Sequence, residues 1–219
     1  MDRETRTLDR GVSTANAHTI VGATRRVEGL PFRFDSETHT YIDLETGSEL
    51  CHITGMLART GWIDDVWFTE ESSERGRCVH TLTADYDLGA LDVATCRTKY
   101  RGWLLAHVAT MKRIRHTWDR IEEPAVHPVY RFGGRPDRVG YALGLKTVFE
   151  VKSGVFQKSH QIQTALQAIL DAAAGGLPAE HYQRLAEYLK PTGRGQIQLF
   201  KDRCDFDEAY RIIKVCCPC

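Results

Sequence analysis

The sequence predicts an α/β fold in which a mixed central β-sheet is flanked by helices. Segments whose apolar residues recur at helical spacing alternate with segments rich in β-branched and aromatic residues. A length of 219 residues suits one domain, and contents of 42% hydrophobic and 26% charged residues are those of a globular protein. We expect a loose polar arm over residues 1–29, one domain over residues 30–215 and a cysteine-rich tail over residues 216–219.

The N-terminal half is predicted to contain a β-hairpin followed by three helices. Aromatic and apolar residues flank the turns of residues 32–46, a pattern typical of a hairpin. A short helix is expected to open with residues 53–57. Apolar residues at helical spacing predict a second helix over residues 72–88 and a third over residues 98–121, whose apolar stripe includes His107.

The C-terminal half is predicted to contain four strands and two helices. Gly133 and Gly134 are expected to break the first strand, and Gly175 and Gly176 to end the first helix. Strand-forming residues and apolar periodicity predict the order strand 126–132, strand 138–142, strand 147–152, helix 159–174, strand 196–200 and helix 207–215.

The charges balance, with 29 basic and 29 acidic residues and a net charge of +0. Proteins that bind nucleic acid through its phosphates are mostly basic overall, so this balance counts mildly against such a role. Local basic clusters can still supply phosphate contacts, although solvated helix and loop faces give the same pattern. The clusters are Arg97, Lys99 and Arg101, then Lys112, Arg113 and Arg115, then Lys190, Arg194, Lys201 and Arg203.

Localisation is indicated by the apolar pattern and by the cysteines. No apolar stretch reaches the roughly 18 residues that a membrane-spanning helix needs. The start of the chain alternates acids and bases, which is not the pattern of a secretory signal. Four of the seven cysteines are scattered along the chain, as free thiols in a reducing compartment are. We therefore expect a cytoplasmic protein that does not associate with a membrane.

Asp137, Glu150 and Lys152 form the pattern that points most directly to chemistry. The two acids are 13 positions apart (150 − 137), each on or beside a predicted strand, so a hairpin brings their carboxylates together. Side chains alternate along a strand, so Glu150 and Lys152 share one face while Phe149 and Val151 share the other. If the second face packs on the core, an acid and a lysine lie side by side at an opening.

This arrangement suits the hydrolysis of a phosphodiester bond. Adjacent carboxylates bind Mg²⁺ or Mn²⁺, and the ion between them offsets their repulsion. A lysine on the same face can hold or deprotonate the attacking water, or neutralise charge on the phosphate. The same spacing also occurs in surface hairpins that carry only a Glu–Lys pair, so the pattern is weak by itself.

Further segments accompany this pattern. They are His39-Thr40-Tyr41, Ile53-Thr54-Gly55-Met56-Leu57, Arg75-Gly76-Arg77-Cys78-Val79-His80, then Gly133 to Gly140, Phe149 to Gly154 and His160-Gln161-Ile162-Gln163. In this combination and order the chain resembles the RecB-like branch of the PD-(D/E)XK nucleases over residues 31–213. That branch includes phage recombination exonucleases and the CRISPR-adaptation nuclease. The resemblance implies a restriction-endonuclease-like core.

The resemblance also implies a role for each matching residue. Asp137 and Glu150 correspond to the metal-binding acids, and the backbone carbonyl of Val151 to a further metal ligand. His80 corresponds to a helix histidine that completes the metal shell. Lys152 corresponds to the catalytic lysine.

Four further positions are matched less fully. Gln163 corresponds to the glutamine of the family's Q-x-x-x-Y helix motif, which orients DNA or the lysine. The tyrosine position of that motif holds Gln167, a departure that affects the second half of the motif but not the metal site. Glu123 resembles a family acid that approaches the site, although a surface role fits a lone acid equally well. Gly76, one turn before His80, is expected to let its helix approach the sheet closely.

The activity implied by the resemblance is Mg²⁺- or Mn²⁺-dependent hydrolysis of DNA. The leading expectation is an exonuclease of phage or prophage type that acts in DNA recombination, repair or end processing, in a bacterial or phage-infected cell. The alternatives are a structure-selective or site-specific endonuclease and a catalytically silent nucleic-acid-binding module. DNA is the expected partner, with a recombination or annealing protein as a second.

The last cysteines invite one more comparison with this family. Some RecB-like nucleases hold an iron–sulfur cluster through one early and three late cysteines. Adjacent cysteines do not easily ligate one cuboidal cluster, and the usual late spacing is wider. We therefore expect no iron–sulfur cluster and a reactive or disordered tail. The late residues are Cys216, Cys217 and Cys219, and the early position would fall to Cys51, Cys78 or Cys96.

Overall fold

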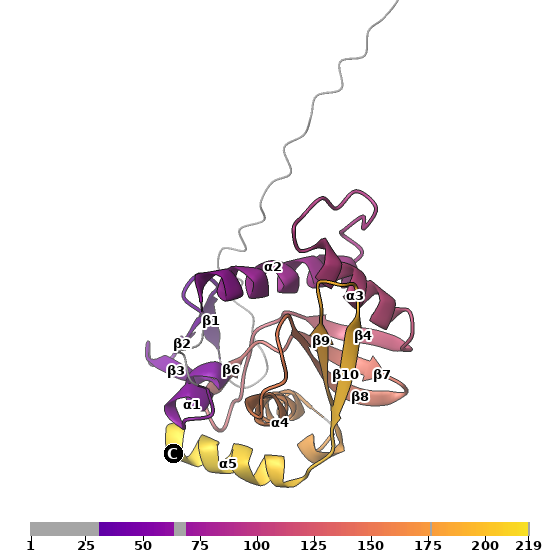
Figure 1. Ribbon diagram of the computed structural model, residues 1–219. Coiled ribbons are helices and arrows are strands. Elements are labelled where there is room, and N and C mark those ends of the chain that lie inside the picture. The colour runs from indigo at the N-terminus through magenta and orange to yellow at the C-terminus, as the bar shows by residue number, and fades with distance from the viewer. Residues whose placement is uncertain (1–30, 64–68, 176, 219) are drawn as a thin grey trace, which may run out of the picture.

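The structure is a computed structural model that describes residues 31–63, 69–175 and 177–218. The predicted N-terminal arm and Cys219 lie outside the described residues. Two five-stranded β-sheets, both mixed, are surrounded by helices (Figure 1). The predicted α/β class, with a mixed sheet flanked by helices, is therefore confirmed. A second sheet, formed by strands from residues 32–52 and 125–134, was not predicted from the sequence.

The first sheet contains the predicted N-terminal hairpin, which is formed by β1 and β2. The strand order is β1–β2–β3–β6–β5, with β3 and β6 parallel and the other neighbours antiparallel. Strand β3, which leads directly into the first helix, was not predicted. The strands are β1 (Phe32–Asp35), β2 (Thr40–Asp43), β3 (Glu49–His52), β5 (Ala125–Val126) and β6 (Phe132–Gly134).

Gly133 and Gly134 lie within β6, so the prediction that they break a strand was wrong. A Cβ added at Gly133 would collide with the ring of Tyr41, and one at Gly134 would lie 2.5 Å from the side chain of Ile53. These glycines are therefore required by close packing and not by a turn. The turn lies earlier, at residues 128–130, and divides the predicted strand 126–132 in two.

The second sheet carries the strands around Glu150. Its order is β10–β9–β8–β7–β4, and β8 and β9 are its one parallel pair among the described strands. The chain crosses from β8 to β9 through a helix. The strands are β4 (His116–Ile121), β7 (Arg138–Ala142), β8 (Leu145–Lys152), β9 (Gln183–Leu189) and β10 (Gly195–Phe200).

Two strands of this sheet differ from the prediction. β4 was assigned to the end of a helix over residues 98–121, but that helix ends at Met111. The segment instead forms the edge strand β4, whose Trp118 packs against Phe149 of β8 with 5.3 Å between the ring centroids. β9 was missed because Arg184 and Glu187 interrupt its apolar run, although both are buried.

Helices cover both faces of the second sheet. Val148 shares an apolar core with α4 and α5, whereas Phe149 and Val151 share another with α2 and α3 (Figure 1). The predicted alternation along β8 is therefore confirmed. No described helix is long and apolar enough to cross a membrane. The helices are α1 (Ile53–Arg59), α2 (Glu70–Asp87), α3 (Arg101–Met111), α4 (Ser159–Ala172), the short η2 (Ala179–His181) and α5 (Cys204–Cys216).

The end of α5 belongs to the core and not to a loose tail. Cys216 is buried among the residues of α1, α4 and α5. The sulfur of Cys217 lies 4.0 Å from the sulfur of Met56, and the thiol of Cys51 donates to the carbonyl of Cys216 at 3.2 Å. The tail expected over residues 216–219 therefore begins, at the earliest, after Cys216.

Candidate active site

A cavity of about 590 Å³ lies among the helices α1, α2 and α4 and the strands β2, β6 and β8. Five residues predicted from the sequence line it, namely His80, Asp137, Glu150, Gln163 and Gln167. They come from four separate parts of the chain: α2, the connection between β6 and β7, β8, and α4. The fold thus brings together residues up to 87 positions apart (167 − 80).

His80, Glu122 and Asp137 converge in this cavity. His80 Nδ1 lies 3.1 Å from Glu122 Oε1 and 3.2 Å from Asp137 Oδ1. One ligand atom of each residue lies within 4.8 Å of the others. Among the residues that the structure describes, this is the only such group of histidine, cysteine and acidic side chains that could hold a metal ion.

Backbone contacts fix Asp137 in place. Its Oδ2 accepts a hydrogen bond from the N–H of Val151 at 2.6 Å, which ties the residue before β7 to β8. Its carbonyl accepts from the N–H of Glu122 at 2.9 Å and from the guanidinium of Arg138 at 2.6 Å. The Asp137 carboxylate is therefore positioned before any ligand enters.

Glu150 lies beneath α4 and is only 2% exposed, but it lines the cavity and so faces an opening, as the strand pattern predicted. Its Oε1 accepts hydrogen bonds from Lys152 Nζ at 2.7 Å and from Gln163 Nε2 at 2.6 Å. Its Oε2 accepts from Gln167 Nε2 at 2.6 Å. Gln163 and Gln167 are four residues apart on α4 and share one helix face, so both amides reach the same carboxylate.

Burial and neighbouring charges set the protonation of these groups. Burial disfavours the charged form of His80, but attraction to Asp137 and Glu122 outweighs it and raises the pKa of His80 to about 10. Burial also disfavours the charged form of Asp137, but attraction to His80 lowers the Asp137 pKa to about 2. For Glu150, burial and then repulsion from Asp137 raise the pKa. An imidazolium at His80 therefore balances the Asp137 carboxylate.

The donors in the cavity suit a hard divalent cation. Glu122 and Asp137 offer carboxylate oxygens, and the imidazole of His80 favours Mn²⁺ relative to a site made of oxygen alone. In addition, the Oε1 atom of Gln167 is buried and has no hydrogen-bond partner among the described residues. A polar acceptor is thus left over in the wall of the same cavity, as a cation or water site requires.

We expect His80→Ala to weaken Mn²⁺ binding by at least about tenfold, because the variant lacks one ligand. Since the pKa of His80 is raised to about 10, the imidazolium must lose its proton to bind the ion, so wild-type affinity should rise as pH rises from 7 towards that value. Calorimetric titration at several pH values measures both effects. His116→Ala, on β4, is the matched control. A lower melting temperature with an unchanged Mn²⁺ titration would make His80 a structural residue.

Two sequence expectations about this site need correction. Glu123 was weighed equally as an acid that approaches the site and as a surface residue, and the acid beside His80 and Asp137 is instead its neighbour Glu122. Gly76 was expected to permit a close helix–sheet approach, but an added Cβ would meet nothing within 4 Å. Gly76 instead lines the cavity, where a missing side chain leaves room.

A chain of four buried charged residues runs from the cavity into the protein. Arg138 Nε donates to Asp87 at 2.6 Å, and His107 lies between Asp87 at 3.0 Å and Glu187 at 2.6 Å. Burial opposes a charge on His107, but bonds to the two carboxylates raise its pKa. The sequence placed His107 in the apolar stripe of its helix, and the structure does bury it. The only sign in the sequence that this buried residue carries a charge was that a histidine occupies a position in an otherwise apolar stripe.

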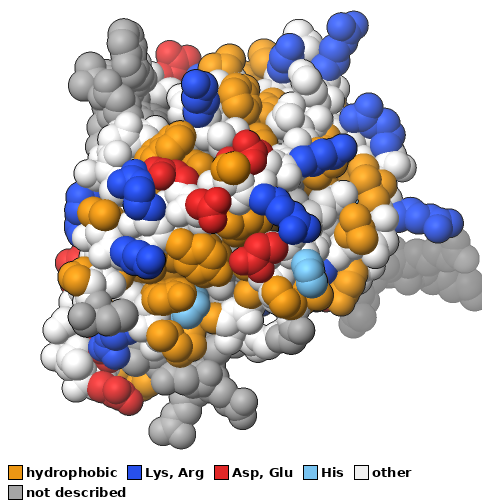
Figure 2. Space-filling view, turned by 90° about the horizontal axis from the view of Figure 1, so that it is seen from below, with side chains coloured by type: hydrophobic (Ala, Val, Ile, Leu, Met, Phe, Trp, Pro, Cys, Tyr) orange, Lys and Arg blue, Asp and Glu red, His pale blue; other side chains and the backbone are white. Residues whose placement is uncertain are grey.

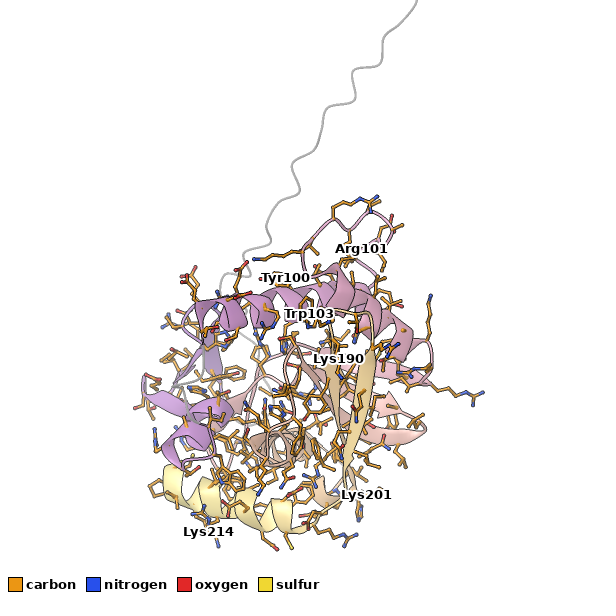
Figure 3. The ribbon with its side chains drawn as sticks, viewed as in Figure 1. Tyr100, Arg101, Trp103, Lys190, Lys201 and Lys214 are labelled. Carbon is orange, nitrogen blue, oxygen red and sulfur yellow. The ribbon has the colours of Figure 1, made fainter. Side chains whose placement is uncertain are left out.

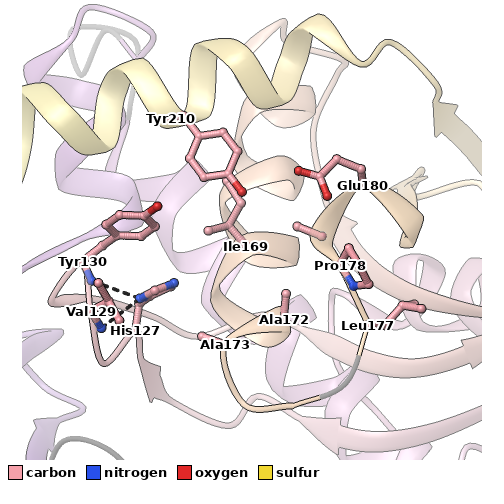
Figure 4. A pocket seen from close by; sticks show the side chains of 11 residues that line it. His127, Val129, Tyr130, Ile169, Ala172, Ala173, Leu177, Pro178, Glu180 and Tyr210 are labelled. Carbon is pink, nitrogen blue, oxygen red and sulfur yellow. Dashed lines mark hydrogen bonds between the residues drawn. The ribbon is translucent and has the colours of Figure 1, made fainter.

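A second cavity, of about 530 Å³, lies between the end of α4, η2 and α5 (Figure 4). Ile169 and Ala172 contribute apolar surface, and His127 and Tyr210 add aromatic rings. Glu180 is the one acidic residue in its lining. Because a lone carboxylate does not make a cation site, this cavity does not compete with the first one as a candidate for metal chemistry.

The face of the molecule that includes α5 mixes charges of both signs. Figure 2 shows lysine and arginine side chains interspersed with acids and apolar groups on this face. On α5 itself, Arg211 pairs with Glu208 at 2.5 Å. A helix surface of mixed sign, such as that of α5 itself, does not attract the phosphates of nucleic acid strongly.

Comparisons with known proteins do not assign a function. No family model matches the chain, and no curated protein matches its sequence. A crystal structure of a protein from Eubacterium rectale, described as "Putative exonuclease", is similar to it with 12% sequence identity and a TM-score of 0.44. The match covers 75% of this chain and 71% of that chain. A likeness of this size supports no conclusion about activity, so the function must be inferred from the site.

Proposed function

We propose that this chain is a metal-dependent DNA nuclease, with exonuclease action in DNA recombination, repair or end processing as its leading activity. The proposal is carried by one observation, the convergence of His80, Glu122 and Asp137 in a cavity that also contains Glu150. Lys152 lies directly beside Glu150. A cation site next to a carboxylate and a lysine is the combination that hydrolysis of a phosphodiester bond needs.

A bound divalent cation would supply positive charge to the non-bridging oxygens of the phosphate. Asp137, Glu122 and His80 would hold it, with the carbonyl of Val151 as a predicted further ligand. The hydrogen bond from the Val151 N–H to Asp137 keeps these groups in register. Such positioning lets the charge act on the phosphate without first rearranging the protein.

Glu150 and Lys152 supply the proton-transferring and charge-neutralising groups. Because its pKa is raised, Glu150 is suited to take up a proton from the attacking water. Lys152 Nζ donates to Glu150 and to Gln163 at 2.7 and 3.0 Å, and it can redirect one of these bonds to a phosphate oxygen or to the water. Gln163 and Gln167 keep the carboxylate aligned.

A structure-selective or site-specific endonuclease is the alternative within the same chemistry, and a silent nucleic-acid-binding module is the alternative outside it. Clustered acids repel phosphate unless a cation lies between them. A module that only binds DNA would therefore lose affinity by keeping Glu122, Asp137 and Glu150 together. This loss of affinity favours a nuclease with a metal site over a module that only binds DNA.

Cleavage of end-labelled linear DNA and of covalently closed circular DNA, each with and without Mg²⁺ or Mn²⁺, tests the proposal. An exonuclease should release nucleotides from the linear DNA and leave the circle intact. Cutting of the circle would indicate an endonuclease. Binding without cleavage of either DNA would leave only the silent module. Asp137→Asn protein, purified in the same way, controls for contaminating nucleases.

A further inference from the structure

The loop that follows Lys152 carries an apolar tip that the proposed chemistry does not use. β8 ends at Lys152 and α4 begins at Ser159, so residues 153–158 connect them. Val155 is 78% exposed and Phe156 is 51% exposed. Single exposed apolar residues need no explanation, but two adjacent ones beside a candidate active site are typical of a binding surface.

Hydrogen bonds hold the loop at both ends. At its start, the indole N–H of Trp103 donates to the carbonyl of Ser153 at 3.3 Å. At its end, the backbone N–H of Gln157 donates to Nδ1 of His160 at 3.3 Å. Both ends of the loop are therefore held in place, and the loop begins directly after Lys152.

Aromatic residues support the inner side of Phe156. Its ring centroid lies 6.2 Å from that of Tyr188 and 6.4 Å from those of His160 and Phe200. The hydroxyl of Tyr188 lies 2.8 Å from Nδ1 of His160. Burial, and then repulsion from Lys152, lower the pKa of His160 to about 3, so its ring is uncharged at neutral pH. Phe156 thus rests on a neutral aromatic base close to the lysine.

Exposed cations flank the tip. Lys158 belongs to the same loop, and Lys201 follows Phe200, whose ring contacts Phe156. Figure 3 shows Arg101, Trp103 and Lys190 at one end of the molecule, where α3 begins and β9 ends. Lys201 is labelled at the opposite end of that view, beside the start of α5. Arg101 and Lys190 therefore lie near the start of the loop at Ser153, whereas Lys201 lies near the ring of Phe156. Lys158 and Lys201 therefore supply positive charge beside an exposed aromatic ring, a combination that matches a nucleic acid with accessible bases.

We propose that Val155 and Phe156 form a stacking platform for an unpaired base, so that the substrate is DNA with a single-stranded end. This inference rests on the proposed nuclease function and names its substrate class. Proteins that bind single strands combine aromatic rings for the bases with cations for the phosphates. In a blunt duplex the bases are already paired and stacked on each other, so the ring of Phe156 has no unpaired base to stack on and should add no affinity for the duplex.

The test is equilibrium binding of a labelled oligothymidylate and of a blunt duplex of equal length, measured by fluorescence anisotropy without divalent metal. Phe156→Leu keeps apolar bulk but removes the ring. It should weaken single-strand binding by about tenfold and change duplex binding by less than about twofold. Phe156→Trp should retain the wild-type affinity. Val129→Ala is the matched control, because Val129 is 67% exposed and lies beside the second cavity.

The salt dependence provides a second readout. The ring contributes no phosphate contact, so the slope of affinity against salt should be the same for Phe156→Leu and for the wild type. Unchanged single-strand binding by Phe156→Leu, equal weakening of both DNAs, or no single-strand binding by the wild type would each overturn the platform.

This assay distinguishes failure of the platform from failure of the nuclease proposal, because it requires no cleavage. A wild-type protein that binds single strands through Phe156 but cuts no DNA would keep the platform and refute the nuclease. If the wild type cuts DNA but Phe156→Leu binds single strands as tightly as the wild type, the nuclease proposal is kept and the platform is refuted.

Discussion

Lys152→Ala should lower the rate of DNA cleavage by about three orders of magnitude, the upper end of what loss of one positioned donor costs at a developing charge. Lys152 Nζ is held between Glu150 and Gln163, so the substitution removes the cation that these two cavity-lining side chains hold in position. The fold should survive, because the lysine side chain is 19% exposed and ends the strand. Single-turnover cleavage with saturating Mn²⁺ measures the effect.

Lys146→Ala is the matched control for this substitution. Lys146 lies on the same strand, its side chain is also 19% exposed, and it pairs with Asp119 at 2.7 Å. It should cleave at nearly the wild-type rate. If Lys152→Ala cut DNA as fast as Lys146→Ala does, the assignment of the catalytic centre would be wrong. Asp137→Asn and Glu150→Gln should be as inactive as Lys152→Ala, since both conserve shape and remove charge.

His107→Ala should reduce the free energy of unfolding by about 3–5 kcal/mol, the usual cost of breaking a buried ion pair from one side. The variant leaves Asp87 and Glu187 buried without the imidazolium that bridges them, and it also leaves a cavity beneath α3. Urea denaturation at pH 6 measures the loss. His116→Ala, at a half-buried histidine of β4, should cost far less.

The pH dependence of this loss follows from the direction of the pKa shifts. The pKa of His107 is raised in the folded protein, so its contribution is complete below the unfolded value of about 6.5 and is lost as pH rises through the folded value. The pKa of Asp87 is lowered, because bonds to His107 and Arg138 outweigh burial. Its contribution is therefore lost as pH falls through that lowered value. The wild type and His107→Ala should differ most in weakly acidic solution, and an equal difference at pH 6 and pH 10 would show that the imidazolium contributes nothing.

The sequence was sufficient where the pattern is local. Alternation along β8 depends only on neighbouring residues, so the opposite orientations of Glu150 and Phe149 could be predicted. The period of the apolar residues likewise predicted the helix that became α4, whereas Gln163 was identified only by the resemblance to the family's helix motif. Combined with the family resemblance, these patterns identified five residues that line one cavity. Their catalytic roles stay predictions until the variants are assayed.

Structure and burial could not be predicted from the sequence at positions where contacts with residues far away in the chain determine them. β9 was missed because Arg184 and Glu187 suggest a surface segment, whereas Arg184 is buried against Asp205 at 2.8 Å and Glu187 against His107. Glu122 and Glu123 lie in the irregular segment between β4 and β5, where no periodicity indicates which of the two side chains lies beside His80. The low exposure of Glu150 depends on the docking of α4, whose Gln163 and Gln167 bond to its carboxylate, and the strand pattern alone does not report that contact.

The parallel pairing of β8 with β9 has a consequence for how the protein is made. β9 begins 31 positions after β8 ends (183 − 152), and α4 lies between them. During synthesis β7 and β8 can pair as a hairpin, and Asp137 can bind Val151, before the glutamines of α4 have emerged from the ribosome. The second edge of β8 meanwhile stays unpaired, as an open strand edge that invites association with other chains. Asp137 and Glu150 are therefore synthesised and paired across β7 and β8 before α4 and β9 exist. If translation stalled before β9, β8 would keep an unpaired edge, and the nascent chain would be prone to aggregate.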